Sequence, residues 1–134
     1  MRVDVNFKAN DHRGSLESFL FKHQIVETNL ITTKIKDLEF QNRGKHFHKH
    51  TNEYLLIISG RMELHVIPLK GKDKNNETIL LLTPGEMVLI KPFCYHWSIF
   101  YTDTTYMNFL DKKFSQKKPD VHCGTREYRR MSDE

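Results

Sequence analysis

Short hydrophobic segments, separated by polar turn residues, recur along the chain. These segments are rich in Ile, Val, Leu, Thr, Tyr and Phe, whose side chains suit a pleated strand better than a helix. Seven of them cover residues 24–35, 54–58, 61–69, 78–82, 87–90, 96–100 and 106–110. In the third segment, Met62, Leu64 and Val66 alternate with mostly polar neighbours, which predicts a strand with one buried face. We therefore expect a protein built mainly from β-strands.

Residues that favour turns lie between these segments. Gly, Pro, Asn, Asp, Ser and Thr predict turns at residues 10–14, 41–44, 59–60, 71–76, 84–85, 92 and 102–104. A short helix or turn is expected around residues 16–22, and no long helix follows. The polar stretch 70–77 predicts an exposed hairpin loop. Many short strands without helical crossovers indicate an all-β antiparallel sandwich or barrel.

Length and composition limit this architecture to a single domain. The chain has 134 residues, of which 38% are hydrophobic. This is enough for one core and too short for separate cofactor and substrate domains. We expect a barrel core over about residues 24–110 and a polar, extended C-terminal segment over residues 111–134. The two cysteines, Cys94 and Cys123, are too few for a disulfide scaffold.

The chain carries no sequence signal for a membrane. It has no apolar run of about eighteen residues, and its N-terminal residues lack the apolar segment of a signal peptide. We therefore expect a soluble, cytoplasmic protein without a membrane partner.

The net charge of +4 would suit an anionic partner, but the basic residues gather only near the C-terminus. The residues in this basic run are Lys112, Lys113, Lys117, Lys118, Arg126, Arg129 and Arg130. Such a run indicates a solvated face and tail, so no nucleic-acid partner is expected.

Histidine occurs eight times, and two copies lie a few residues before a glutamate. His46 and His48 are two residues apart, so in an extended strand their side chains point to the same side. Glu53 follows a short bend, and His96 begins a later strand. Imidazole nitrogens and a carboxylate are ligands that Fe, Mn, Ni and Zn accept. These residues therefore predict a site for a divalent metal ion.

His50 offers a rival register, because His48 and His50 are also two residues apart. Only two residues separate that pair from Glu53, whereas four separate His48 from Glu53. We prefer the pair His46 and His48, which leaves His50 behind the site or facing solvent. Cys94 lies two residues before His96 and is either a further ligand or an inert buried thiol.

The spacing of these residues resembles two motifs of the cupin family. The first motif is matched by His46, His48, Glu53 and Gly60, and the second by Gly85, Pro92 and His96. The resemblance implies a single-domain cupin jelly-roll β-barrel whose cavity holds a metal ion on His46, His48, Glu53 and His96. The chain departs from the family pattern at Phe40, Lys91 and Phe93, where Gly, Pro and Gly are frequent. These departures affect turns more than the ligand set.

A second resemblance concerns the substrate. Asp11, Arg13 and Gly14 resemble the Asp-x-Arg-Gly opening of cupins that act on nucleotide sugars, the dTDP-sugar epimerases and 3,4-ketoisomerases of surface-polysaccharide pathways. Arg13 would then bind phosphate through its guanidinium group, and Lys91 is a second candidate for phosphate. Alternatively, Asp11 and Arg13 only stabilise a turn.

The expected function is that of a sugar-nucleotide or carbohydrate isomerase or epimerase that uses cavity histidines and a divalent metal ion. His46 or His48 would shuttle a proton, and Tyr95 and Tyr106 are candidate proton donors. The histidines are either ligands or a metal-free acid/base pair. An Fe(II)-dependent dioxygenase and a non-catalytic metal- or sugar-binding module are the alternatives. Open strand edges and exposed aromatic residues predict a homodimer.

Overall fold

The structure, a computed structural model, describes residues 1–122 and contains eleven β-strands in that range. Seven expected segments form strands, with bounds shifted by a few residues. Cys123 and the arginines Arg126, Arg129 and Arg130 lie outside the described residues. Within the described part of the chain, no helix is long and apolar enough to cross a membrane.

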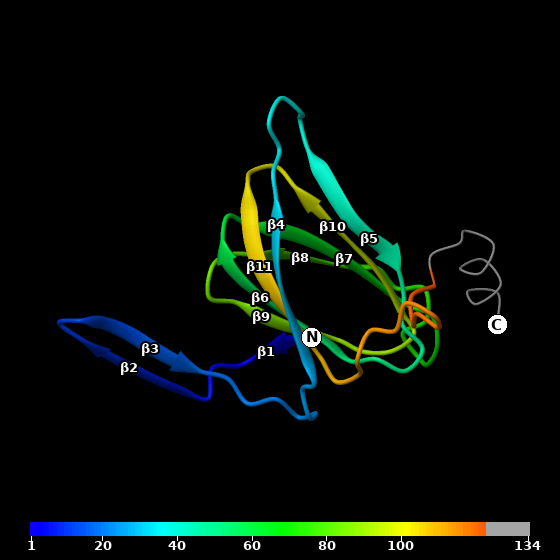
Figure 1. The fold of residues 1–134 in the computed structure, drawn as a ribbon, viewed down its shortest axis with the longest axis horizontal. Coiled ribbons are helices and arrows are strands. Elements are labelled where there is room, and N and C mark those ends of the chain that lie inside the picture. Colours follow the sequence, from blue (N-terminus) through cyan, green and yellow to red (C-terminus); the bar gives the residue numbers. More distant parts are fainter. Residues whose placement is uncertain (123–134) are drawn as a thin grey trace.

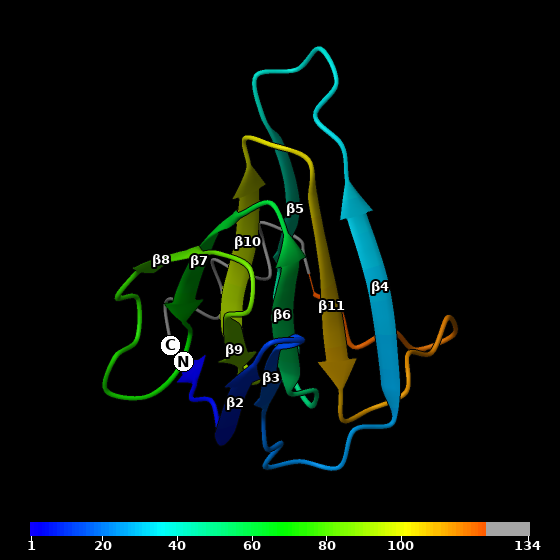
Figure 2. The same ribbon diagram turned by 90° about the vertical axis from the view of Figure 1, so that its left-hand side faces the viewer.

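Two antiparallel sheets face each other and form a jelly roll (Figure 1). The five-stranded sheet has the order β1 (Arg2–Val3), β9 (Met87–Ile90), β6 (Glu53–Ser59), β11 (Thr104–Leu110) and β4 (Glu27–Thr33). The four-stranded sheet has the order β5 (Gln41–His46), β10 (Cys94–Phe100), β7 (Met62–Pro68) and β8 (Thr78–Leu82). Figure 2 shows β6, β11 and β4 side by side in the larger sheet. The expected all-β cupin-type jelly roll is confirmed.

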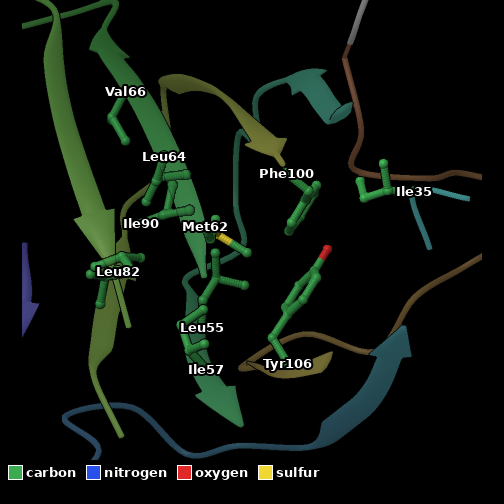
Figure 3. Close-up of a cluster of buried hydrophobic side chains, with 11 residues drawn as sticks. Ile35, Leu55, Ile57, Met62, Leu64, Val66, Leu82, Ile90, Phe100 and Tyr106 are labelled. Atoms are coloured by element: carbon green, nitrogen blue, oxygen red, sulfur yellow. The ribbon is translucent and has the colours of Figure 1, made fainter. Parts of the chain in front are cut away.

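The hydrophobic core fills the space between the two sheets (Figure 3). Met62, Leu64 and Val66 are fully buried on β7, so the expected alternation of buried and outward-facing residues is confirmed. From the larger sheet, Leu55 and Ile57 of β6 join the same cluster. Because both sheets contribute side chains, the core fixes their separation. Buried polar residues also lie between the sheets, among them His48, Glu53, His96 and Asn108 of the site described below.

The expected helix around residues 16–22 was wrong. Strands β2 (Phe7–Asp11) and β3 (Gly14–Ser18) form a hairpin with a tight turn at His12 and Arg13. Seven residues are too few to nucleate a helix without tertiary support, whereas pairing with β2 satisfies the backbone of β3. The hairpin projects from the body of the molecule (Figure 1).

Strand β5 replaces the turn expected at residues 41–44. Its sequence, Gln-Asn-Arg-Gly-Lys-His, contains no hydrophobic residue, because β5 is an edge strand whose side chains are mostly exposed. Gly44 and Lys45 have positive φ values of 96° and 63°, and the register against β10 shifts at this point. This is a β-bulge, and it becomes important for the site because it lies next to His46.

Candidate functional site

Three histidines and one glutamate meet between the two sheets. His46 ends β5, His48 lies in the following loop, Glu53 begins β6, and His96 lies on β10. Each offers one ligand atom, and these four atoms lie within 4.8 Å of one another. His46 and His96 are paired across neighbouring strands, and Glu53 comes from the opposite sheet. The cluster therefore joins the sheets inside the jelly roll.

Hydrogen bonds orient the members of this cluster. Glu53 Oε1 lies 3.3 Å from Nε2 of His48 and 3.4 Å from Nε2 of His96. The Nδ1 atoms of the two histidines face backbone carbonyl oxygens, at 2.7 Å for His48 and 2.9 Å for His96. Asn108 Nδ2 donates to the other oxygen of Glu53, at 3.0 Å. Both rings therefore turn Nε2 toward the carboxylate.

Burial and neighbouring charges give these groups different pKa values. Burial, together with the charges of His96 and His48, lowers the pKa of His46 to about 4. Burial also opposes a charge on His48, but its contacts with Glu53 raise its pKa above the ordinary value. For Glu53 itself, burial opposes ionisation, and the hydrogen bonds from His48 and His96 outweigh it and lower the pKa. At neutral pH, His46 is therefore a neutral imidazole beside a carboxylate.

A cavity of about 240 Å³ opens onto the cluster. Its polar lining consists of Arg43, His46, Glu53, His96, Ser98, Tyr106 and Asn108. Burial raises the pKa of Tyr106 to about 12, so its hydroxyl keeps its proton. Ligand pockets typically measure roughly 300–1,000 Å³. The cavity is smaller than this range, so it can enclose only part of a ligand of that size.

The structure brings five of the candidate residues together and leaves the others apart. The five are His46, His48, Glu53, His96 and Tyr106, the last of which lines the cavity. The preferred pair of histidines is in the cluster, while His50 is exposed and does not belong to it. Cys94 is half-buried, burial raises the pKa of its thiol, and it is not a member of the cluster.

Tyr95, Lys91 and Arg13 lie away from the cluster. Tyr95 precedes His96 on β10 and faces the opposite side of the sheet, where its ring lies 5.8 Å from that of Trp97. Lys91 is exposed and does not line the cavity. Arg13 lies at the tip of the hairpin and pairs with Asp11 at 2.6 Å. Within one chain, none of these three side chains reaches the cavity.

Arg43, Asn108 and Asp120 are site residues that the sequence did not indicate. Arg43 is exposed, lines the cavity, and donates to the hydroxyl of Thr33 at 2.6 Å. It is three residues before His46, a spacing that normally places side chains on opposite faces of a strand. The β-bulge inserts an extra residue, so both side chains face the cavity.

Phe93 occupies a position where the cupin motif frequently has Gly, and it adopts the backbone conformation that Gly favours. Its φ is 59°, which is uncommon for a bulky residue. Its ring lies 6.3 Å from that of Phe47, and the Lys70 ammonium group sits 3.8 Å from the ring centre. The departure from the motif therefore changes the side chain and preserves the turn that leads into His96.

The fold and this site define a class of protein. A jelly roll that encloses three histidines and a glutamate between its sheets is a cupin-type fold. The chain belongs to the family described as FdtA: WxcM-like, C-terminal, whose model matches residues 4–122. No curated protein matches the chain.

Several solved structures share the fold at low sequence identity. A 3,4-ketoisomerase from Helicobacter canadensis is 18% identical with a TM-score of 0.79, over 100% of this chain and 97% of that one. A mutant of the 3,4-ketoisomerase QdtA from Thermoanaerobacterium thermosaccharolyticum, in complex with TDP-4-keto-6-deoxyglucose, is 18% identical with a TM-score of 0.76, over 99% and 93%. A dTDP-4-dehydrorhamnose 3,5-epimerase from Sulfolobus tokodaii is 17% identical with a TM-score of 0.70, over 90% and 74%.

Proposed function

We propose that this protein is a nucleotide-sugar isomerase or epimerase, and specifically a 3,4-ketoisomerase of a TDP-linked keto sugar. The observation that carries the proposal is His46, a neutral imidazole on the wall of a sugar-sized cavity. Membership of the FdtA family and the ketoisomerases of similar fold support the choice of substrate.

The residues of the cavity can carry out this isomerisation by moving protons. His46 takes the proton from the carbon next to the sugar carbonyl, and a proton is returned to the former carbonyl carbon. The C3–H and O3–H bonds are broken and C4–H and O4–H bonds form through an enediol, so the carbonyl moves from C4 to C3 and no oxidant or reductant is needed. Tyr106, which keeps its proton and lines the cavity, would donate a hydrogen bond to a sugar oxygen.

Arg43 would bind the nucleotide part of the substrate. Its guanidinium group is exposed where the cavity opens, while the cavity is too small for a whole nucleotide sugar. Guanidinium groups bind phosphates through paired hydrogen bonds. The sugar would enter the cavity and the diphosphate would remain at Arg43, which orients the sugar carbonyl toward His46.

A substrate assay tests this function. Incubation with TDP-4-keto-6-deoxyglucose, followed by NMR, should show conversion to the 3-keto isomer. Replacing His46 with Asn should lower the rate by at least about 100-fold, in line with the loss of a general base. Tyr95→Phe is the matched control, because Tyr95 is on the same sheet but faces away from the cavity. Equal rates for the wild type and the His46 variant would contradict the proposal.

The same donor set also fits a divalent metal ion. Its imidazole nitrogens and carboxylate oxygen lie within 4.8 Å of one another, and these are donors that Fe, Mn, Ni and Zn accept. The ligands would be His46, His48, Glu53 and His96, and a bound ion would supply a Lewis acid that polarises a carbonyl. A nitrogen of His46 that binds the ion is no longer a base, so its two roles are alternatives.

Elemental analysis of the purified protein distinguishes these roles. Stoichiometric metal that is lost in His48→Ala and His96→Ala variants would support a metal centre, and full retention in both would exclude these ligands. Iron with oxygen uptake would point to a dioxygenase. Binding of the TDP-sugar without turnover would instead point to a sugar-binding module.

The β2–β3 hairpin supports the proposal of a homodimer. Phe7, Ala9 and Leu16 lie on one face of the hairpin, and Phe7 and Leu16 are more than half exposed. An isolated two-stranded hairpin is marginally stable in water. A second copy of the chain would cover this face, and only in such an assembly would Arg13 be able to approach a cavity.

A further inference from the structure

A segment near the C-terminal end of the described chain packs against the loop that joins β5 to β6. Phe47 and His122 exchange two backbone hydrogen bonds, of 3.1 and 3.0 Å, and their rings lie 5.3 Å apart. This loop carries His48 and leads directly into Glu53. The segment 120–122 therefore holds the part of the chain that supplies half of the histidine–glutamate cluster.

The carboxylate of Asp120 binds three consecutive residues of this loop. Its Oδ1 accepts from the backbone N–H of Lys49, and its Oδ2 accepts from the backbone N–H of His50 and from the hydroxyl of Thr51, each at 2.8 Å. His122 Nε2 lies 3.1 Å from Oδ1. Burial opposes ionisation, but these donors outweigh it and lower the pKa of Asp120 to about 2. One ionised side chain thus fixes residues 49–51, which lead from His48 toward Glu53.

The backbone carbonyl of Asp120 contacts the cluster itself. It accepts a hydrogen bond from His48 Nδ1 at 2.7 Å. A carbonyl oxygen can only accept, so Nδ1 carries a proton in this contact, and Nε2 carries the second proton when the charged ring also donates to Glu53. When the ring is neutral and one proton remains, the 2.7 Å contact with the carbonyl favours Nδ1 over the 3.3 Å contact of Nε2. His96 makes the equivalent contact with Cys94 on its own strand. The orientation of His48, in contrast, depends on a residue 72 positions away in the sequence.

We propose that Asp120 is a positioning residue: its carboxylate holds the loop, and its carbonyl oxygen holds His48 in the tautomer that presents Nε2 to the cluster. Its importance for catalysis rests on the proposed function, whereas its effect on the His48 ring does not require turnover.

Asp111 provides a matched control on the same loop. Its carboxylate accepts from the backbone N–H and the side-chain amide of Asn52, at 2.7 and 2.9 Å. It therefore anchors the loop as Asp120 does, but its side-chain hydrogen bonds go to Asn52 rather than to His48. An Asp111→Ala variant measures the general cost of loosening the loop.

The direct test is ¹⁵N NMR of the histidine rings in metal-free protein, in alkaline buffer where the rings are neutral. The wild type and Asp111→Ala should show His48 as the Nδ1–H tautomer. Asp120→Ala keeps the backbone carbonyl but removes the carboxylate contacts that hold the loop against it. His48 should then show a mixture with the Nε2–H tautomer, and Asp120→Asn, which keeps one acceptor oxygen, a smaller fraction of it. If Asp120→Ala does not fold, the Asn variant decides. An unchanged tautomer in the folded Asp120 variants would overturn the proposal.

Kinetics separate this proposal from the proposed function. Asp120→Ala should lower kcat by about 10-fold to 100-fold, as expected for loss of a residue that orients a site histidine, with little change in KM. Asp111→Ala should change kcat much less, and an equal loss in both variants would reduce Asp120 to a purely structural role. If the wild type converts no nucleotide sugar, the proposed function fails, and the NMR result still decides the role of Asp120.

Discussion

His46 and Glu53 belong to one buried cluster, yet their surroundings shift their pKa values for different reasons. Burial dominates for His46 and lowers its pKa, which favours the neutral ring. For Glu53, the hydrogen bonds with His48 and His96 outweigh burial and lower its pKa, which favours the carboxylate. A histidine with a depressed pKa is available as a base throughout the neutral range. At the scale of residues, the proposal of His46 as the base therefore follows from its environment.

This environment predicts a pH-dependent stability. The pKa of His46 is about 4 in the folded state against 6.5 for the free side chain, so between these values the unfolded chain binds a proton that the folded chain does not. Because of His46, the free energy of unfolding should therefore fall by about 3 kcal/mol as the pH is lowered from 6.5 to about 4. Denaturant unfolding of metal-free protein at several pH values measures this slope.

The variants for this test are His46→Asn and, as a control, His12→Asn on the exposed hairpin. The loss of stability over this pH window should be smaller in His46→Asn than in the wild type, and unchanged in His12→Asn. The same slope in all three proteins would show that His46 is not held neutral by the fold.

The bulge in β5 is the feature at the scale of elements that builds the cavity wall. It allows Arg43 and His46 to face the same side although they are three residues apart. Gly44 is required there because its φ is positive, and because an added Cβ would lie 2.9 Å from the carbonyl oxygen of His96. A side chain at this position would push β5 away from β10.

A Gly44→Ala variant tests the bulge. We expect a loss of about 1–3 kcal/mol in the free energy of unfolding, from backbone strain and crowding, with reduced activity because His46 shifts. Gly71→Ala is the control, because its φ is also positive, 87°, but nothing lies within 4 Å of an added Cβ. Thermal and denaturant unfolding give the comparison, and equal losses in the two variants would mean that crowding against β10 contributes nothing.

Local pattern explains which elements could be predicted from the sequence. Strands β7 and β10 lie in the middle of a sheet and bury alternate residues, so their hydrophobic period identified them. Strands β5 and β3 are mostly exposed, so no hydrophobic period marks them. They are strands because partner strands satisfy their backbone hydrogen bonds, and pairing between strands is not encoded locally.

The same limit applies to the site. The spacing of His46, His48 and Glu53 was sufficient to expect a cluster, because two strands and one bend place them together. Asn108 and Asp120 reach Glu53 and the loop from later parts of the chain. Contacts of that kind depend on the completed fold, and Asn and Asp occur too widely at surfaces to indicate a site on their own.

At the scale of the whole molecule, the β2–β3 hairpin stands apart from the sheets (Figure 1). Its face formed by Phe7, Ala9 and Leu16 is apolar, and the opposite face carries the ion pair between Lys8 and Glu17. An exposed apolar face on an otherwise polar hairpin indicates a contact surface. The proposed homodimer would bury this face.

A joint Phe7→Ser and Leu16→Ser variant should shift the protein from dimer to monomer, because it removes apolar surface that the second copy would cover. Sedimentation velocity or light scattering gives the mass in solution. The control is the joint Lys8→Gln and Glu17→Gln variant, which alters the opposite face and should remain dimeric. A monomeric wild type at high protein concentration would contradict the proposed dimer.

The central claim is that His46 moves a proton on a keto sugar held in the cavity. The most direct measurement is deuterium incorporation from D₂O into TDP-4-keto-6-deoxyglucose or its isomer, followed by NMR. We predict that the wild type introduces deuterium at the carbons exchanged in the isomerisation, that Tyr95→Phe does the same, and that His46→Asn does not. Undiminished incorporation by His46→Asn, or none by the wild type, would contradict the account.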